Sequence, residues 1–323
     1  MIELPSIPLI PDFAIDLATL SLISFLLLLS FFSLCLIFYL HFKTQNTHYL
    51  QRFNALWTVR LLLVFIIILW TLNENLRLPL LRRNYLYLFF QNLTLFQQSS
   101  LCKVHLVLSL GFLEPGFLVT LLFLLHVSIK KKTPRGSWAF ALLLAVCLPL
   151  SVLQFLFVFF QRLEKRLPMF FRRSSVIFRV EDSGEKTVLC SYPLLSTCLF
   201  GGFIVVYLLY FLFSCWSVVS LVINKKLRIR TYTLAFAVLT SIALQVLFLG
   251  LSVLWTPEKQ AFGLVTFLAF LSTFTCAVVG QGILVISPIA DSLAVGGRHF
   301  CRRWHPPIWS RPDDHEFGEG ENV

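Results

Sequence analysis

Long apolar runs alternate with short polar segments along most of this chain. Each run holds about 20 residues, the length that an α-helix needs to cross a hydrocarbon core of about 30 Å. Seven runs reach this length, at residues 18–41, 56–73, 104–128, 138–160, 195–223, 232–255 and 261–287. The pattern predicts an all-α, polytopic membrane protein, with a seven-helix bundle over residues 18–288, an outer segment of residues 1–17 and a tail of residues 289–323.

Composition points to a lipid environment. Of the 323 residues, 57% are hydrophobic and 13% are charged, and the mean hydropathy is +0.80. Because so few charges cannot cover the surface of a soluble chain of this size, composition argues against a soluble enzyme, a nucleic-acid binder and a disordered scaffold. The net charge of +11 is carried by Lys and Arg clusters beside the apolar runs, where they meet lipid headgroups.

The placement of charges predicts how the chain is oriented. Residues 1–17 contain acidic but no basic side chains, whereas Lys43 and Arg52 follow the first run. Because basic loops stay in the cytoplasm, we expect the N-terminus outside and, after seven spans, the C-terminus inside, in the plasma membrane or an endomembrane. Arginines in the loops 74–103 and 161–194 oppose this assignment, but long loops obey the rule less strictly. Lipid or partner contact is expected at the basic inner loops, at Lys130, Lys131, Lys132, Lys225, Lys226, Arg228 and Arg230.

The chain lacks the motifs of familiar enzymes. It contains no phosphate-binding loop, no His-Glu-x-x-His and no Gly-x-Ser-x-Gly, and its seven histidines are isolated from one another. We therefore predict no catalytic activity, no metal site and no cofactor.

Two cysteines lie on the predicted outer side. Cys102 just precedes the third apolar run and Cys190 lies in the long loop before the fifth, so both are free to oxidise. A disulfide between them would tie the loop to the helix, and the alternative is a set of free thiols that includes Cys198. The same loop alternates apolar and polar residues at 176–180 and 187–189 around a Ser-Gly turn, which predicts a short β-hairpin.

This layout resembles that of G-protein-coupled receptors, and in particular the divergent group of plant orphan seven-transmembrane candidate receptors. The resemblance implies a Cys102–Cys190 disulfide, an outer pocket for an unknown ligand and a cytosolic signalling partner. The motifs depart from the rhodopsin-like pattern, because His126–Ser128 stands in place of an acidic-Arg-Tyr triplet and Ser287–Asp291 in place of Asn-Pro-x-x-Tyr. Rhodopsin-type switching is therefore not expected.

Glu114 lies deep inside the third run and is followed by a Pro-Gly pair that predicts a kink. An ionised carboxylate at this depth costs several kcal/mol, so we expect it to be neutral, hydrogen-bonded or facing a wet cavity. Two interpretations stay open. Glu114 is the floor of a ligand pocket or a protonation switch, or it has a structural role and bonds one of the intramembrane glutamines Gln154, Gln245 and Gln281.

Other features predict modification or packing. Asn92, in Asn92-Leu93-Thr94, is a glycosylation acceptor if its loop is outside. Cys301 lies in a basic, aromatic part of the tail and is a candidate for palmitoylation, the alternative being a basic tail held by headgroups alone. Residues 85–96 form either an interfacial segment or an extension of the flanking helices. Gly280-Gln281-Gly282 predicts a close approach between helices.

Together these patterns favour a receptor-like function, in which an outer pocket biases helix positions that a cytosolic partner senses. A small-solute or proton-coupled transporter or channel, and a non-catalytic membrane scaffold, are the alternatives. The receptor is preferred because the chain has no internal repeat and because Glu114 is expected to be a single buried carboxylate without a relay.

Overall fold

The computed structural model of the protein describes residues 10–45, 56–78, 94–129, 136–159, 175–179, 186–221, 225–255, 257 and 259–294. Within these ranges, seven helices are long and apolar enough to cross a membrane. This agrees with the predicted all-α polytopic bundle.

Five of the seven spans are continuous α-helices: α1 (Ile10–Gln45), α3 (Trp57–Asn75), α8 (Gly136–Phe159), α11 (Leu194–Leu221) and α12 (Lys225–Ser252). Each of the other two contains a π-helical turn. The third span consists of α6 (Leu95–Leu108), η1 (Ser109–Leu113) and α7 (Glu114–Ile129). The seventh consists of α13 (Gln260–Gln281), η2 (Gly282–Ile286) and further helix to Ala294.

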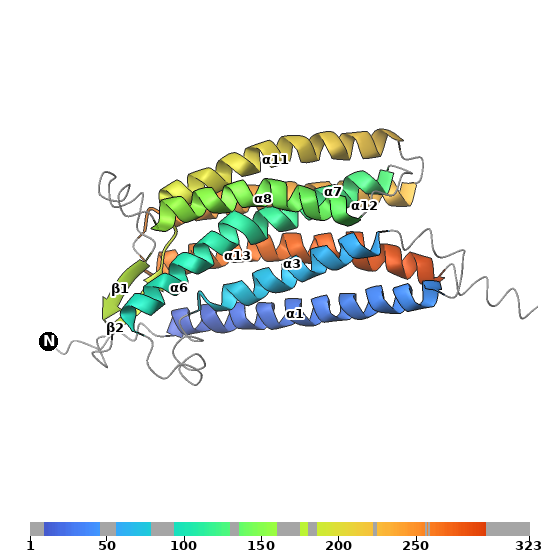
Figure 1. The fold of residues 1–323 in the computed structure, drawn as a ribbon. Helices are drawn as coiled ribbons and strands as arrows, with labels where there is room; N and C mark the ends of the chain where they lie inside the picture. The colour runs from blue at the N-terminus through green and yellow to red at the C-terminus, as the bar shows by residue number, and fades with distance from the viewer. Residues whose placement is uncertain are drawn as a thin grey trace, which may run out of the picture.

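The predicted β-structure is confirmed as two short antiparallel strands, β1 (Ser175–Arg179) and β2 (Lys186–Cys190). They lie at one end of the bundle, beside the start of α6 (Figure 1). We call this the hairpin end. The opposite end, where α3 and α12 begin, is called the far end.

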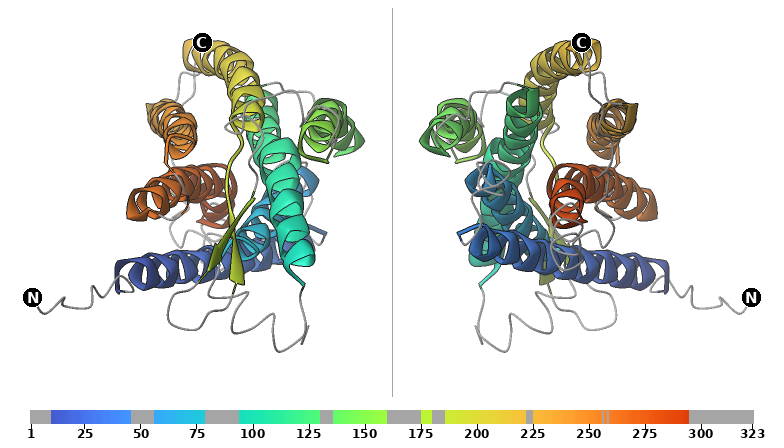
Figure 2. Two further views of the ribbon diagram at one scale, coloured as in Figure 1. Left: turned by 90° about the vertical axis from the view of Figure 1, so that its left-hand side faces the viewer. Right: turned by 90° about the vertical axis from the view of Figure 1, so that its right-hand side faces the viewer.

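The third span lies inside a ring made by the others (Figure 2). α1 packs against α3 and α13, α13 against α12, and α12 against α11. The third span contacts α3, α8 and α11, and it is the most deeply buried of the seven. A polar group in its middle is therefore surrounded by protein rather than lipid.

The outer surface of the ring is apolar. Large side chains such as Leu28, Phe213, Trp216 and Phe236 are exposed, while Leu26 and Phe211 on the same helices are buried. Helices that are apolar on all sides match a lipid surround, because water would leave these side chains as a large unfavourable patch.

Four spans differ clearly in length from the prediction. The first runs from Ile10 to Gln45, so residues 10–17, which were assigned to the outer segment, belong to its helix. The third begins at Leu95, because Thr94 and Gln97 form a capping box, and Cys102 therefore lies within the helix rather than before it. The sixth begins at Lys225, so the cations assigned to a loop form its first turns. The seventh continues beyond Pro288 to Ala294. Pro288 has no N–H to donate to the preceding turn, and the wide π turn η2, which ends just before it, lets the helix continue past this missing hydrogen bond.

The predicted kink beside Glu114 takes the form of the π turn η1, which ends immediately before it. Pro115 has no N–H to donate to the preceding turn, and the Gly111 carbonyl accepts instead from Ser151 Oγ of α8 at 2.9 Å. A Cβ at Gly111 would lie 3.0 Å from Ser151 Cα, so glycine is required where α8 meets this turn. The predicted close approach in the seventh span involves Gly280, whose Cβ would lie 3.1 Å from a methyl group of Leu121.

Candidate functional site

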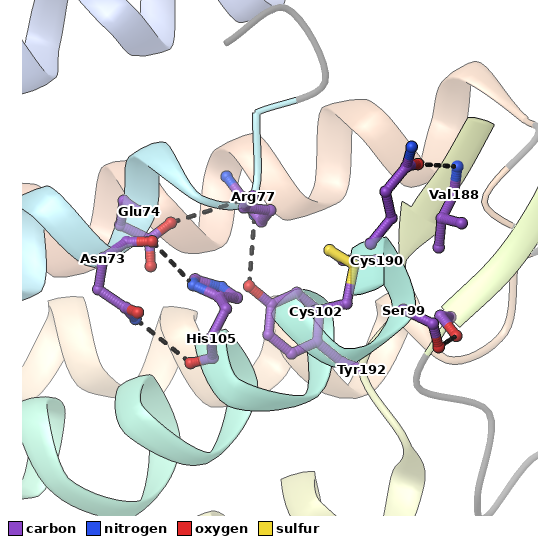
Figure 3. The surroundings of a disulfide bond; sticks show 11 residues. Asn73, Glu74, Arg77, Ser99, Cys102, His105, Val188, Cys190 and Tyr192 are labelled. Atoms are coloured by element: carbon purple, nitrogen blue, oxygen red, sulfur yellow. Dashed lines mark hydrogen bonds and ion pairs between the residues drawn. A yellow bond between two sulfur atoms is a disulfide. The ribbon is translucent and has the colours of Figure 1, made fainter. Parts of the chain in front are cut away.

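A disulfide fixes the hairpin to the third span. Cys102 of α6 is joined to Cys190, the last residue of β2, with their Cα atoms 5.2 Å apart (Figure 3). Two polar contacts support the same junction: Ser99 Oγ lies 2.8 Å from Ser175 Oγ, and the Val188 N–H donates to Gln98 Oε1. The structure thus contains the predicted pair, and Cys198 is a free, exposed thiol.

A buried arginine connects the chain after β2 to the last turn of α3. Arg77 Nη1 donates to Tyr192 Oη at 3.5 Å, and its Nε lies 3.5 Å from Glu74 Oε2 (Figure 3). Arg77 Nη1 also donates to the Thr266 carbonyl at 3.4 Å. Burial raises the pKa of the Tyr192 hydroxyl above its ordinary value, so this side chain stays neutral. The Arg77–Glu74 ion pair near the hairpin is also largely buried, since the two side chains are 13% and 4% exposed.

His105 adds a second link between α3 and α6 at the same depth. The Asn73 side-chain amide donates to the His105 carbonyl at 3.2 Å, and His105 Nδ1 lies 3.0 Å from the Asn73 carbonyl (Figure 3). This reciprocal contact holds the end of α3 against the helix that carries Cys102. The acidic group of Glu74 is thereby fixed in place next to the third span.

The Glu114 carboxyl accepts hydrogen bonds from three spans. Ser109 Oγ, in the same span, lies 2.8 Å from Glu114 Oε1, and Trp70 Nε1 of α3 donates to this oxygen at 3.4 Å. Gln245 Nε2 of α12 donates to the other oxygen, Oε2. Ser109 Oγ also lies 3.4 Å from Glu74 Oε1, so one hydroxyl bridges two buried carboxyl groups.

The bridging hydroxyl restricts the number of protons in this cluster. A serine hydroxyl has one proton to donate. Its contacts with Glu74 and Glu114 are two separate hydrogen bonds only when one carboxyl carries a proton and donates to the hydroxyl oxygen; otherwise the hydroxyl proton is shared between the two carboxyl groups. Arg77 supplies one positive charge, which lies beside the Glu74 carboxylate and also interacts with Asp16. A second ionised carboxylate would be an unpaired charge in a low-dielectric interior, at a cost of several kcal/mol.

Of the three glutamines predicted as partners of Glu114, only Gln245 reaches it. Gln154 Nε2 donates to the Ser196 carbonyl at 3.0 Å and joins α8 to α11. Gln281 Nε2 donates to Ser33 Oγ at 2.8 Å and joins α13 to α1. These two amides stabilise helix contacts elsewhere in the bundle, as polar groups within apolar helices commonly do.

A small cavity lies beside Glu114. It is lined by Ile67, Trp70, Glu114, Phe117, Thr273 and Ala277. It is far smaller than the pockets of roughly 300–1,000 Å³ that usually hold small molecules. The space suits a water molecule or a small group moving with the carboxyl better than a bulky ligand.

At the far end, the start of α12 is bonded to the end of the seventh span. Asp291 accepts from Lys226 Nζ at 2.9 Å and from Arg230 Nη1. Lys225 and Arg228 are exposed on the same turns of α12. The other residues singled out from the sequence lie outside the described part of the chain, namely Asn92, Lys130, Lys131, Lys132, Cys301 and most of the segment 85–96.

The expectation of a single buried carboxylate is wrong. Glu74 is 3% exposed and Glu114 is 7% exposed, and both contact Ser109. Glu74 falls after the predicted end of the second span, in a polar Asn-Glu-Asn sequence that is typical of an interface. One sequence feature could have indicated that Glu74 is paired: Glu74 and Arg77 carry opposite charges and lie three residues apart at the end of a helix.

The fold and the site define a seven-helix bundle with a disulfide-fixed hairpin at one end and a buried carboxyl pair near its middle. Residues 7–300 match the family described as "Uncharacterised conserved protein UCP031277". Because this match covers most of the chain, the protein belongs to that family. Comparison with curated proteins and with solved structures found no match.

Proposed function

We propose that this protein is a receptor-like, multi-pass integral membrane protein in which an event at an outer hairpin end alters the cytoplasmic end of α12. One observation carries the proposal. A continuous series of polar contacts leads from Tyr192, next to the hairpin, to Gln245 in the second half of α12. Polar contacts are costly to bury in an apolar bundle, so a connected series of them points to a role beyond packing.

Two features support the orientation. The Cys102–Cys190 disulfide requires an oxidising compartment, so the hairpin end belongs outside. The exposed cations at the start of α12 are at the opposite end, where basic residues are retained in the cytoplasm. Arg77 no longer counts against this orientation, because it is buried and paired with Glu74 rather than facing headgroups.

The outer half of the series responds to the hairpin. Tyr192 lies two residues after β2. A displacement of the disulfide-bonded hairpin therefore changes the distance between Tyr192 and Arg77. Arg77 in turn neutralises Glu74, with the two side chains 3.5 Å apart. A ligand that displaces Arg77 thereby raises the cost of keeping Glu74 ionised.

The inner half converts a change of charge into a change of helix contact. If the proton in the cluster moves from Glu114 to Glu74 through Ser109, Glu114 becomes the ionised group. Its bond from Gln245 then becomes charge-assisted, and such bonds are roughly twice as strong as neutral ones. The third span and α12 are therefore held together more or less tightly according to the position of one proton.

α12 is restrained at two heights, by Gln245 in the bundle and by the Asp291 contacts at the far end. A change in the Gln245 contact is expected to shift the first turns of α12, or to make them fluctuate more, at the Asp291 contacts. This makes the first turns of α12 the output surface, where a cytosolic partner would bind.

Hydrogen–deuterium exchange of the full chain in lipid nanodiscs tests this coupling. Tyr192→Phe and Glu114→Ala are expected to increase exchange in the first two turns of α12, although both substitutions lie far above them. Gln154→Leu is the matched control, because it removes an equally buried amide that lies outside the series. Exchange that rises only around each substituted residue would refute the coupling.

Proton-coupled transport is the second candidate, and the shared Ser109 contact of two carboxyl groups favours it. Proteoliposomes that contain the protein and a trapped pH indicator separate the two functions. A proton flux that disappears in Glu114→Gln would support transport, whereas coupling to α12 without any flux supports the receptor.

A further inference from the structure

Arg60 is a buried cation at the far end of α3. It lies in the first turn of this helix and is 8% exposed. Among the residues that the structure describes, the ion pairs are Arg77–Glu74, Lys226–Asp291 and Arg230–Asp291, and none includes Arg60. Its Nε is buried without a hydrogen-bond partner. Since a guanidinium is always charged, this arginine is a buried charge without an acidic partner among the residues that the structure describes.

The start of α3 is itself positive. Leu56 precedes the helix and provides no side-chain cap, and the first turn contains no acidic residue. The free N–H groups and the helix dipole therefore attract negative charge at this position. Side chains in a helix lean toward its N-terminus, so Arg60, the fourth residue of α3, lies at the same end of the helix as these N–H groups. Two independent positive features thus converge on one place.

The surroundings strengthen this attraction. Val59 and Leu63, on either side of Arg60 along α3, are buried, and α3 packs against α1 and the third span. The ring of Trp57 lies 4.3 Å from the ring of His41 on α1, which closes one side of the helix start. In such an apolar setting an anion bound to Arg60 is screened by water much less than at the surface.

We propose that the far end of α3 is a binding site for a phosphate group, held by the Arg60 guanidinium and the free N–H groups of the first helical turn. The guanidinium fork takes two oxygens of a phosphate, and a further oxygen remains for the helix N-terminus. A carboxylate has only the two oxygens that the fork would use. The phosphate can belong to a lipid headgroup or to a soluble anion, and the site does not depend on the receptor proposal.

Thermal unfolding of the full chain in a phosphate-free maltoside detergent tests the site. Inorganic phosphate, titrated at constant ionic strength, is one arm, and mixed micelles with phosphatidic acid are the other. Parent protein is expected to gain a saturable rise in Tm in at least one arm. A response to inorganic phosphate identifies a soluble anion as sufficient, and a response to phosphatidic acid alone identifies a headgroup.

Arg60→Gln is expected to weaken the apparent phosphate affinity by at least about tenfold. Without phosphate, the same variant should unfold at a higher Tm than the parent, because it removes an uncompensated buried charge. Arg60→Lys keeps the charge but loses the fork, so its affinity should fall between the two. Arg228→Gln is the matched control, since it removes an exposed arginine from the same end of the bundle and should respond as the parent does.

Two results would overturn the proposal. One is a parent protein whose Tm rises in neither arm. The other is an Arg60→Gln variant that responds to phosphate as the parent does, or that is less stable than the parent before phosphate is added, because Arg60 would then have a structural partner.

Discussion

Ser109 and Glu114 face each other because a π turn lies between them. Ser109 Oγ is 2.8 Å from Glu114 Oε1, although the residues are five positions apart in one span. In an α-helix, with 3.6 residues per turn, positions five apart point in different directions. The wider turn η1 brings them onto one face, which also points toward Glu74. The irregularity of the third span is thus what assembles the carboxyl cluster.

Substitutions of Glu114 should follow an order set by hydrogen bonding. Glu114→Gln should unfold close to the parent, because its amide oxygen still accepts from Ser109 and Trp70 and the Gln245 amide can turn to accept from the new N–H. Glu114→Ala should lose about 1–3 kcal/mol through donors left unpaired. Glu114→Lys should be the least stable, since a cation at this depth is disfavoured by roughly 3 kcal/mol.

Thermal unfolding in one detergent ranks these three variants. Equal stability for the Ala and Lys variants and the parent would show that Glu114 is not confined in the cluster. A Gln variant of normal stability that nevertheless increases exchange in the first turns of α12 would assign Glu114 a role in coupling rather than in structure.

Infrared spectroscopy should detect one protonated carboxyl group in the cluster. The parent is expected to show a carbonyl band that shifts in D₂O, and both Glu74→Gln and Glu114→Gln should lose it, because the remaining carboxylate is balanced by Arg77. Gln154→Leu is the control. A parent without the band would mean that both carboxyl groups are ionised, contrary to the proton count.

The helices and part of the site could be predicted from the sequence. Apolar runs of membrane length identify spans because the bilayer imposes that length on any crossing helix. The Cys102–Cys190 pair and the partner Gln245 followed from residues that stand out against an apolar background. The sequence left Gln245 as one of three candidate glutamines, and the cysteine pair depended on the predicted topology and on the receptor resemblance.

Glu74 and Arg60 could not be found in this way. Whether a polar residue near a helix end faces water or a neighbouring helix depends on tertiary packing, which no local pattern encodes. Glu74 is buried because α6 begins at Leu95 and extends beside the end of α3. The same holds for η1, since Pro115 predicts a kink but not that it becomes a π turn.

The Asp291 contacts should matter more for α12 dynamics than for global stability. Exposed ion pairs contribute about 0–1 kcal/mol, so Asp291→Asn should change Tm little. Its effect on hydrogen exchange in the first turns of α12 should be clear. Arg230→Gln should have the larger effect of the two partner substitutions, because its side chain is 24% exposed whereas that of Lys226 is 65% exposed. Identical exchange in all variants would exclude these contacts as a restraint.

The orientation can be tested with tags on intact cells. An N-terminal tag should be accessible to antibody without permeabilisation, and a C-terminal tag only after it, because seven spans place the ends on opposite sides. An accessible C-terminal tag would reverse the assignment. A glycan on Asn92 would support it, but absence of sugar would not contradict it, because apolar neighbours can block modification.

Cys102→Ser and Cys190→Ser should destabilise the protein equally, and the double variant should be no worse than either one. Two residues that act through one shared bond lose it together, so their effects are not additive. The bond closes a loop between positions 88 residues apart, which suggests about 3–4 kcal/mol, and less because the membrane already restrains both ends. Cys198→Ser, which removes a free thiol, is the control. Additive losses, or a mass spectrum in which Cys102 is reduced or joined to Cys198, would reject the pairing.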